Sequence, residues 1–275
     1  MTSIIDERPA EHAPPKPRSL GRINWLGFWT LYLKEVRRFM NVATQTVLAP
    51  VVTTLLFLAI FTLALGRAAP EVGGVSYAQF LAPGLVMMSM IQNAFANTSS
   101  SILISKVQGN IVDVLMPPLN AAELTMAYAL GGVTRGLVVG LSVALAMWIF
   151  VPMQVHDPLA ILFFAVSASL MLSLIGLIGG IWADKFDHIA AVQNFAVMPL
   201  SFLSGTFYSI DRLPENWRFV ADFNPFFYNI DGLRYGFIGH ADGSLLIGVG
   251  VSIAINAFLL AVAYLIVARG YKLKA

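Results

Sequence analysis

Long stretches without charged side chains constrain this sequence more than any other feature. Asp, Glu, Lys and Arg are absent from residues 41–66, 72–105, 158–183, 189–210 and 243–268, and residues 124–155 contain only Arg135. Each stretch can hold the roughly 20 apolar residues that a membrane-spanning helix requires. We therefore expect the chain to cross a membrane several times.

These stretches are apolar throughout and not at alternate positions, which favours helices over the strands of a membrane barrel. They predict six spanning helices, at residues 42–65, 80–104, 124–151, 159–182, 189–207 and 245–268. With 57% hydrophobic and 12% charged residues, the chain leaves little for a soluble domain. We predict an all-α integral membrane domain at residues 23–275, preceded by a disordered, Pro-rich cytoplasmic tail at residues 1–22.

Lys and Arg are distributed unevenly between the two ends of the predicted spans. One end receives the basic residues of the first forty positions and of the segment after residue 268, together with Lys106 and Lys185. The other end has Arg67, Arg212, Arg218 and Arg234. By the positive-inside rule the first end is cytoplasmic, and it holds both termini. The net charge of +2 is too small to indicate a nucleic-acid partner.

Residues 25–40 have the spacing of an amphipathic helix before the first span. Apolar side chains share one face, and basic side chains share another: Trp25, Trp29, Tyr32, Leu33, Val36 and Met40 on the first, and Lys34, Arg37 and Arg38 on the second. Aromatic and basic side chains suit the headgroup region of a membrane. The helix is expected to lie in the interface, as a topological anchor, as a platform for a cytoplasmic partner, or as both.

The stretch "GNIVDVLMPPLNAAEL" at residues 109–124 interrupts the apolar sequence between the second and third spans. Gly109 can end one helix, Asn110 can cap a short second helix, and Pro117-Pro118 can stop it. Asn120 and Glu123 then have the spacing of a capping box for the third span. The short helix carries more apolar side chains than an exposed two-turn helix can justify: Ile111, Val112, Val114, Leu115 and Met116. Either the chain's own helix ends or a separate protein would cover them.

Residues 208–243 combine many aromatic residues with regularly placed charges. The segment is too charged to span a membrane and too aromatic for a solvated loop. Short re-entrant or interfacial helices, with breaks at Pro214 and at Asn224-Pro225, reconcile the two properties.

Polar side chains inside the predicted spans are the candidates for a transport path, because an unpaired amide in hydrocarbon is costly. The candidates are Asn93, Asn97, Arg135 and Asn194. Hydrogen bonding between helices is the competing explanation for the amides, and contact with backbone carbonyls or the interface is the competing explanation for Arg135. Gly132, Gly136 and Gly140 predict a close helix-packing seam.

Several kinds of chemistry find no support in the sequence. There is no Walker A loop, no G-x-S-x-G elbow and no cysteine, and the four histidines do not cluster with carboxylates at metal-ligand spacing. An enzyme is therefore not expected, and neither is a cofactor in this chain. A transporter driven by an ion gradient is less favoured because no predicted span contains Asp or Glu. A non-transporting membrane scaffold is a further alternative.

The order of these features resembles the permease subunit of type 2 ABC exporters, over nearly the whole chain from about residue 25 to residue 269. The more specific resemblances are "PLSFLSGTFYSIDRLPENW", "NPFFYNIDGLRYG" and "GGVTRG". They point to the bacterial branch that exports drugs, nodulation factors and polysaccharides. The resemblance implies a multi-pass protein of the bacterial inner membrane that exports an amphiphilic, lipid-linked or saccharide-type molecule. It implies two partners, a second permease copy and a cytoplasmic ATPase subunit that binds ATP and Mg.

The resemblance also implies roles for particular residues. The coupling helix that docks on the ATPase corresponds to Asn110, Ile111, Val112, Asp113, Val114, Leu115 and Met116. The interfacial connecting helix corresponds to residues 25–40, with Trp25, Trp29, Lys34, Glu35, Arg37 and Arg38. Outer re-entrant helices correspond to residues 209–239.

Overall fold

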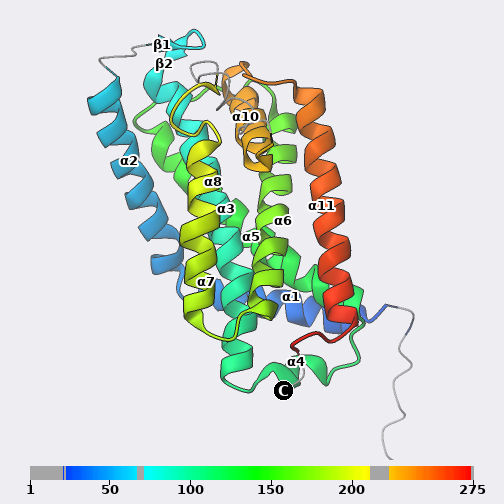
Figure 1. Ribbon diagram of the computed structural model, residues 1–275. Coiled ribbons are helices and arrows are strands. Elements are labelled where there is room, and N and C mark those ends of the chain that lie inside the picture. Colours follow the sequence, from blue (N-terminus) through cyan, green and yellow to red (C-terminus); the bar gives the residue numbers. More distant parts are fainter. Residues whose placement is uncertain (1–20, 22, 67–70, 211–222, 274–275) are drawn as a thin grey trace, which may run out of the picture.

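The computed structural model describes residues 21, 23–66, 71–210 and 223–273, which form a bundle of long helices (Figure 1). The helices, in chain order, are α1 (Trp25–Met40), η1 (Thr44–Leu48), α2 (Ala49–Leu65), α3 (Tyr77–Val107), α4 (Ile111–Leu115), α5 (Ala121–Trp148), α6 (Pro158–Trp182), α7 (Phe186–Val192), η2 (Gln193–Val197), α8 (Met198–Leu203), α10 (Pro225–Ile238) and α11 (Leu245–Ala268). The tail predicted at residues 1–22 and the break predicted at Pro214 fall outside the described residues, apart from residue 21.

Each range predicted to span a membrane is mostly helical, although the third and fifth ranges extend beyond the ends of α5 and α8. The first corresponds to η1 and α2, the fifth to the run α7–η2–α8, and the others to α3, α5, α6 and α11. Among the described residues, four helices are long and apolar enough to cross a membrane: Thr44–Ala64, Ala121–Trp148, Pro158–Trp182 and Leu245–Ala268. The chain is therefore a multi-pass membrane protein, and the full count of six spans stays a prediction.

Helix α3 lies at the centre of the bundle (Figure 1), where it contacts α2, α5, α6 and α10. Its polar residues explain why it is less apolar than its neighbours. Asn97, Thr98 and Ser99 are fully buried, and their side chains face protein and not lipid. The interpretation of these polar groups as protein-facing is confirmed for α3.

The predicted glycine seam on α5 is confirmed. A Cβ atom added at Gly132 would lie 2.2 Å from Ser173 Oγ of α6, and one added at Gly140 would lie 2.3 Å from Met90 Cγ of α3. At Gly136 the added atom would meet Ser169 Oγ at 2.7 Å. The absence of side chains on this face of α5 thus lets three helices approach closely.

The two ends of the bundle differ. One end carries α4, the end of α11 and α1, which runs across the long helices (Figure 1). The other carries α10 and a small hairpin, β1 (Glu71–Val72) paired antiparallel with β2 (Val75–Ser76). The prediction of an all-α fold did not include this hairpin. It forms because Gly73 and Gly74 adopt the positive φ angles, 62° and 78°, that a two-residue hairpin turn requires.

Helix α10 begins at Asn224-Pro225, where the sequence predicted a break. Asn224 caps the helix by accepting from the Phe226 amide, and Pro225 occupies its first turn. The helix is largely buried against α3, α6 and α11. With 14 residues it is about 21 Å long, shorter than the hydrocarbon core of a bilayer. Whether it is re-entrant in a membrane stays a prediction.

The glycine seam leads to a stability prediction. Replacing Gly132 by Val forces a side chain into Ser173 and should lower the free energy of unfolding by about 1–3 kcal/mol. The matched control is Gly250→Val on α11, where an added Cβ meets nothing within 4 Å. Thermal unfolding of the purified variants is the measurement. Equal melting temperatures for the two variants would contradict the seam.

Candidate functional site

Helix α4 connects α3 to α5 and divides its side chains between two environments. Ile111 and Val114 are buried, each 6% exposed, in an apolar cluster with Leu124 and other residues of the same end. Val112 is 51% exposed and Met116 is 76% exposed. The chain's own helix ends therefore cover one side of the segment, and the other side offers apolar surface that nothing in the described chain covers.

Two details of this segment differ from the prediction. Asn110 occupies the N-cap position of α4, but its side chain does not accept a hydrogen bond from the helix backbone. Its Nδ2 instead donates to Gln108 Oε1 at 3.4 Å, because the turn backbone at Asn110 is not extended. Leu115 packs in part against the buried cluster, so it is less available to a partner than its sequence position indicates. As predicted, Gly109, with φ of 75°, follows the end of α3, and Pro117-Pro118 follow the end of α4.

Glu123 joins three pieces of backbone at the start of α5. The predicted capping box is present: Asn120 Oδ1 accepts from the Glu123 amide, and Glu123 Oε2 accepts from the Asn120 amide, each at 2.8 Å. The other carboxylate oxygen accepts from the backbone amide of Asn24 at 2.7 Å. Asn24 also caps α1 through Gly27 and donates from Nδ2 to Pro118 O at 3.2 Å. One carboxylate thus ties the first turn of α1 to the segment that carries α4.

The segment after α11 completes this end of the bundle. Leu273 is buried in the same cluster as Ile111 and Val114. Lys272 Nζ donates to Trp182 O at 3.0 Å and to Asp184 Oδ2 at 2.8 Å. The hydrogen bond between Lys272 and Asp184 lowers the pKa of the Asp184 carboxyl and raises the pKa of the Lys272 amine. Leu273 was not a predicted site residue, since only its position in three dimensions reveals its contact with α4.

Helix α1 begins and ends at the predicted residues, but it presents a more complex surface. Trp25 and Trp29 are exposed, as are Lys34 and Arg37, in agreement with the predicted interfacial helix. Arg38 does not join the exposed basic face. Its Nη2 donates to Asn97 O at 2.7 Å and to Asn97 Oδ1 at 2.9 Å, so the guanidinium turns toward α3.

Glu35 explains why Arg38 turns inward. Its side chain is fully buried; Oε1 accepts from Ser101 Oγ of α3 at 2.8 Å, and Oε2 lies 3.2 Å from Arg38 Nη2. Gly131 of α5 leaves space for this carboxylate stem, because an added Cβ would lie 2.7 Å from Glu35 Cβ. A carboxylate among the apolar residues of α1, three positions before an arginine, is the sequence signal for this buried pair.

The candidate path residues divide into two groups. Arg135 Nη2 donates to Asn93 Oδ1 at 3.1 Å, and Asn97 holds Arg38, so three of the four predicted residues join one polar cluster between α1, α3 and α5. Asn194 is exposed, on the π-helical segment η2. No described contact links it to the cluster. π-helical turns often occur at functional sites, but this one lies on a different surface of the chain.

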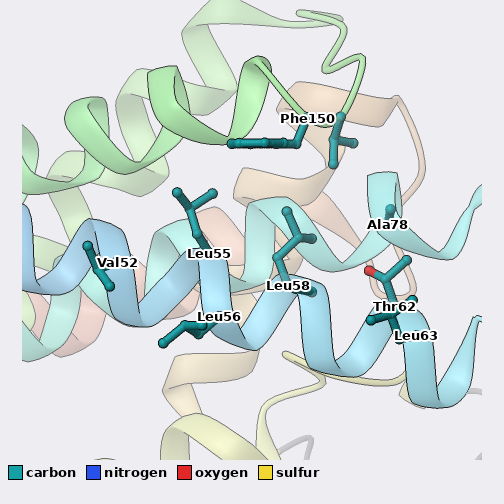
Figure 2. A pocket seen from close by; sticks show the side chains of 10 residues that line it. Val52, Leu55, Leu56, Leu58, Thr62, Leu63, Ala78 and Phe150 are labelled. Atoms are coloured by element: carbon teal, nitrogen blue, oxygen red, sulfur yellow. The ribbon is translucent and has the colours of Figure 1, made fainter.

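Two grooves on the surface of the described chain have apolar walls. Figure 2 shows one of about 540 Å³ beside α2, lined by Leu55 and Leu58 of that helix, by Ala78 of α3 and by Phe150 after α5. Thr62 supplies its only polar side chain among the lining residues. A second groove, of about 780 Å³, lies between α6 and α11. Such walls suit hydrocarbon, and none of the four candidate path residues lines either groove.

Comparison with known proteins identifies the family. The sequence profile of the ABC-2 type transporter family matches residues 27–238. The inner membrane transport permease YadH of Escherichia coli K12 is 38% identical over 251 residues, which cover 91% of this chain and 98% of that protein. Nodulation protein J of Rhizobium leguminosarum bv. trifolii is 24% identical over 222 residues, 80% of this chain and 83% of the relative. The chain therefore belongs to the ABC-2 type transporter family.

Proposed function

We propose that this chain is the permease subunit of an ATP-driven exporter in a bacterial inner membrane. It would cross the membrane six times with both termini in the cytoplasm, and a separate ATPase subunit would bind and hydrolyse MgATP. The relation to an inner membrane transport permease supports the location and the general activity. Two copies of the permease would assemble with the ATPase, as the resemblance to type 2 ABC exporters implies.

The surface of α4 is the observation that carries this proposal. Val112 and Met116 are exposed apolar side chains on a short segment whose other side is fixed in the bundle by Ile111 and Val114. An apolar patch on a rigidly held segment suits docking to a second protein, because little ordering is needed on binding. The proposed docking surface consists of the exposed side chains of this segment, Val112, Asp113 and Met116.

The bonds of Glu123 give the docking surface a mechanical connection to the rest of the chain. A displacement of α4 by an ATPase would move residues 117–120 and, through the Asn24 amide and Glu123, the first turn of α1. Helix α1 in turn packs against α5 and reaches α3 through Arg38. ATP-driven movement would thus reach the centre of the bundle through α1 as well as through α3 and α5.

A gradient-driven transporter is the alternative from another class. Coupling to protons or sodium needs a group that responds to the ion. Helices α2, α3, α6 and α11 contain no Asp or Glu, and Glu123 of α5 is occupied by two backbone amides. Glu35, the carboxylate that reaches α3, is occupied by Ser101 and Arg38. Export that stops with an uncoupler while ATP is intact would favour this alternative.

The topology can be tested with a matched pair of glutamines, because the chain has no native cysteine. Gln108 and Gln154 are both exposed, and they lie before α4 and between α5 and α6. In intact cells an impermeant thiol reagent should label Gln154→Cys and should leave Gln108→Cys unlabelled until the membrane is opened. Labelling of Gln108→Cys from outside would overturn the proposed orientation.

Docking can be tested at the most exposed positions of α4. Val112→Asp and Met116→Glu place an unpaired charge in the proposed interface, and each should reduce association with the ATPase more than about tenfold. The matched control is Val155→Asp, an exposed valine between α5 and α6. Copurification of the ATPase with each variant is the measurement. Undiminished copurification with Val112→Asp would exclude α4 as the docking segment.

The connection through Glu123 can be tested by amide hydrogen exchange. Glu123→Ala removes the acceptor of the Asn24 amide, so this amide at the start of α1 should exchange roughly fivefold faster, the effect of losing a hydrogen bond worth about 1 kcal/mol. Docking of the ATPase should persist because Val112 and Met116 are unchanged. Gln79→Ala, which removes the capping box of α3, is the control. Unchanged exchange of the Asn24 amide would contradict the connection.

A further inference from the structure

Two arginines from different helices meet one face of α3. Arg38 of α1 donates from Nη2 to Asn97 Oδ1 at 2.9 Å, and Arg135 of α5 donates from Nη2 to Asn93 Oδ1 at 3.1 Å. Asn93 and Asn97 are four residues apart in one helix, so their Cβ atoms lie about 5–6 Å apart on the same face. The two guanidinium groups therefore occupy adjacent turns of α3.

One carboxylate lies beside the two arginines, and it pairs with Arg38 alone. Glu35 pairs with Arg38 at 3.2 Å and accepts from Ser101, so its charge offsets that of Arg38. Arg135 bonds to a neutral amide, and no salt bridge to it is found among the described residues. The cluster thus carries one uncompensated positive charge in a largely apolar surrounding, which is strongly unfavourable without a counter-charge.

The cluster also lacks hydrogen-bond acceptors. Arg135 Nε and Asn97 Nδ2 are buried donors without a partner in the described part of the chain. Asn97 is fully buried, so bulk water cannot satisfy it. The excess positive charge, on an Arg135 side chain that is only partly buried, can be offset by a bound oxyanion. Guanidinium groups are well suited to phosphate and carboxylate.

The position of the cluster across the membrane indicates where the anion comes from. Tyr32 of α1 is hydrogen-bonded to Thr134 at 2.9 Å, which places α1 beside Arg135 along α5. The exposed Trp25 and Trp29 are typical of a helix at the level of lipid headgroups. The Arg38 side chain is 29% exposed and Arg135 is half-buried, so these two side chains, unlike the fully buried Asn97, are open to a ligand from that level.

We propose that Arg135 and Arg38, which Asn93 and Asn97 hold on adjacent turns of α3, form a binding site for the phosphate or carboxylate head of an amphiphile in the same leaflet as α1. Arg135 supplies the uncompensated charge, Asn93 holds its guanidinium, and Arg38 places a second, partly exposed guanidinium beside it. This inference rests on the exporter function proposed above, in which the site receives the cargo. The cargo is then an anionic amphiphile that enters from the cytoplasmic leaflet.

Thermal unfolding of the purified full-length chain in neutral detergent tests the site, with phosphatidylglycerol, phosphatidylcholine or inorganic phosphate added. Phosphatidylglycerol should raise the melting temperature and phosphatidylcholine should not. In Arg135→Gln the apparent affinity for phosphatidylglycerol should fall about tenfold or more, as expected for the loss of hydrogen bonds to a charged group. Arg37→Gln, an exposed arginine on α1, is the control and should keep the parent response.

Stability without lipid separates a binding role from a structural one. Because the Arg135 charge is uncompensated when the site is empty, Arg135→Gln should melt no lower than the parent in neutral detergent. A variant that fails to fold, or that keeps the full response to phosphatidylglycerol, overturns the proposal. An equal response of the parent to inorganic phosphate would replace the amphiphile by the free ion and would likewise overturn it.

A second arm tests the assignment to cargo, in the complex with the ATPase. Phosphatidylglycerol should stimulate ATP hydrolysis by the parent complex and by Arg37→Gln, but not by Arg135→Gln. Binding without stimulation would overturn the cargo assignment and leave a resident lipid site. Binding by the chain together with a failure of any ATPase to copurify would instead contradict the proposed exporter function, so the two failures are distinguishable.

Discussion

In the middle of the bundle, two hydroxyl groups bond three helices to one another. Thr98 Oγ1 of α3 donates to Ser173 O of α6 at 2.7 Å, and Ser173 Oγ donates to Ala129 O of α5 at 2.9 Å. A membrane provides little hydrophobic force between helices, so such bonds and close packing hold a bundle together. The seam at Gly132 makes the approach possible. Helix α1 and the proposed docking surface both depend on this arrangement, since they pack on the ends and sides of the same three helices.

The elements of this fold follow from local sequence. Charge-free length predicts the long helices, and the capping box at Asn120 and Glu123 predicts where α5 begins. These signals are local, because a helix needs only its own backbone bonds and a suitable first turn. The hairpin at Gly73-Gly74 could also have been predicted from its two glycines between valines.

The site follows from the sequence only in part. The helical periodicity of α1 correctly places Trp25 and Arg37 on exposed faces of the helix. It cannot indicate that Arg38 turns inward, because that depends on Asn97, which is 59 positions away in the chain. For the same reason, the sequence cannot indicate that Leu273 packs in the cluster of α4 or that the Asn24 amide bonds to Glu123. Contacts between distant segments decide which long polar side chains face lipid headgroups and which face protein.

The burial of Leu273 beside Ile111 and Val114 has a consequence for biogenesis. Translation produces α4 long before it produces the segment after α11. During that interval the apolar side of α4 lacks part of its cover, and the first turn of the segment can still shift. The proposed docking surface is therefore complete only after α11 has been inserted and the residues after it have packed against α4. If the proposed ATPase binds there, this order would keep incompletely inserted chains from recruiting it.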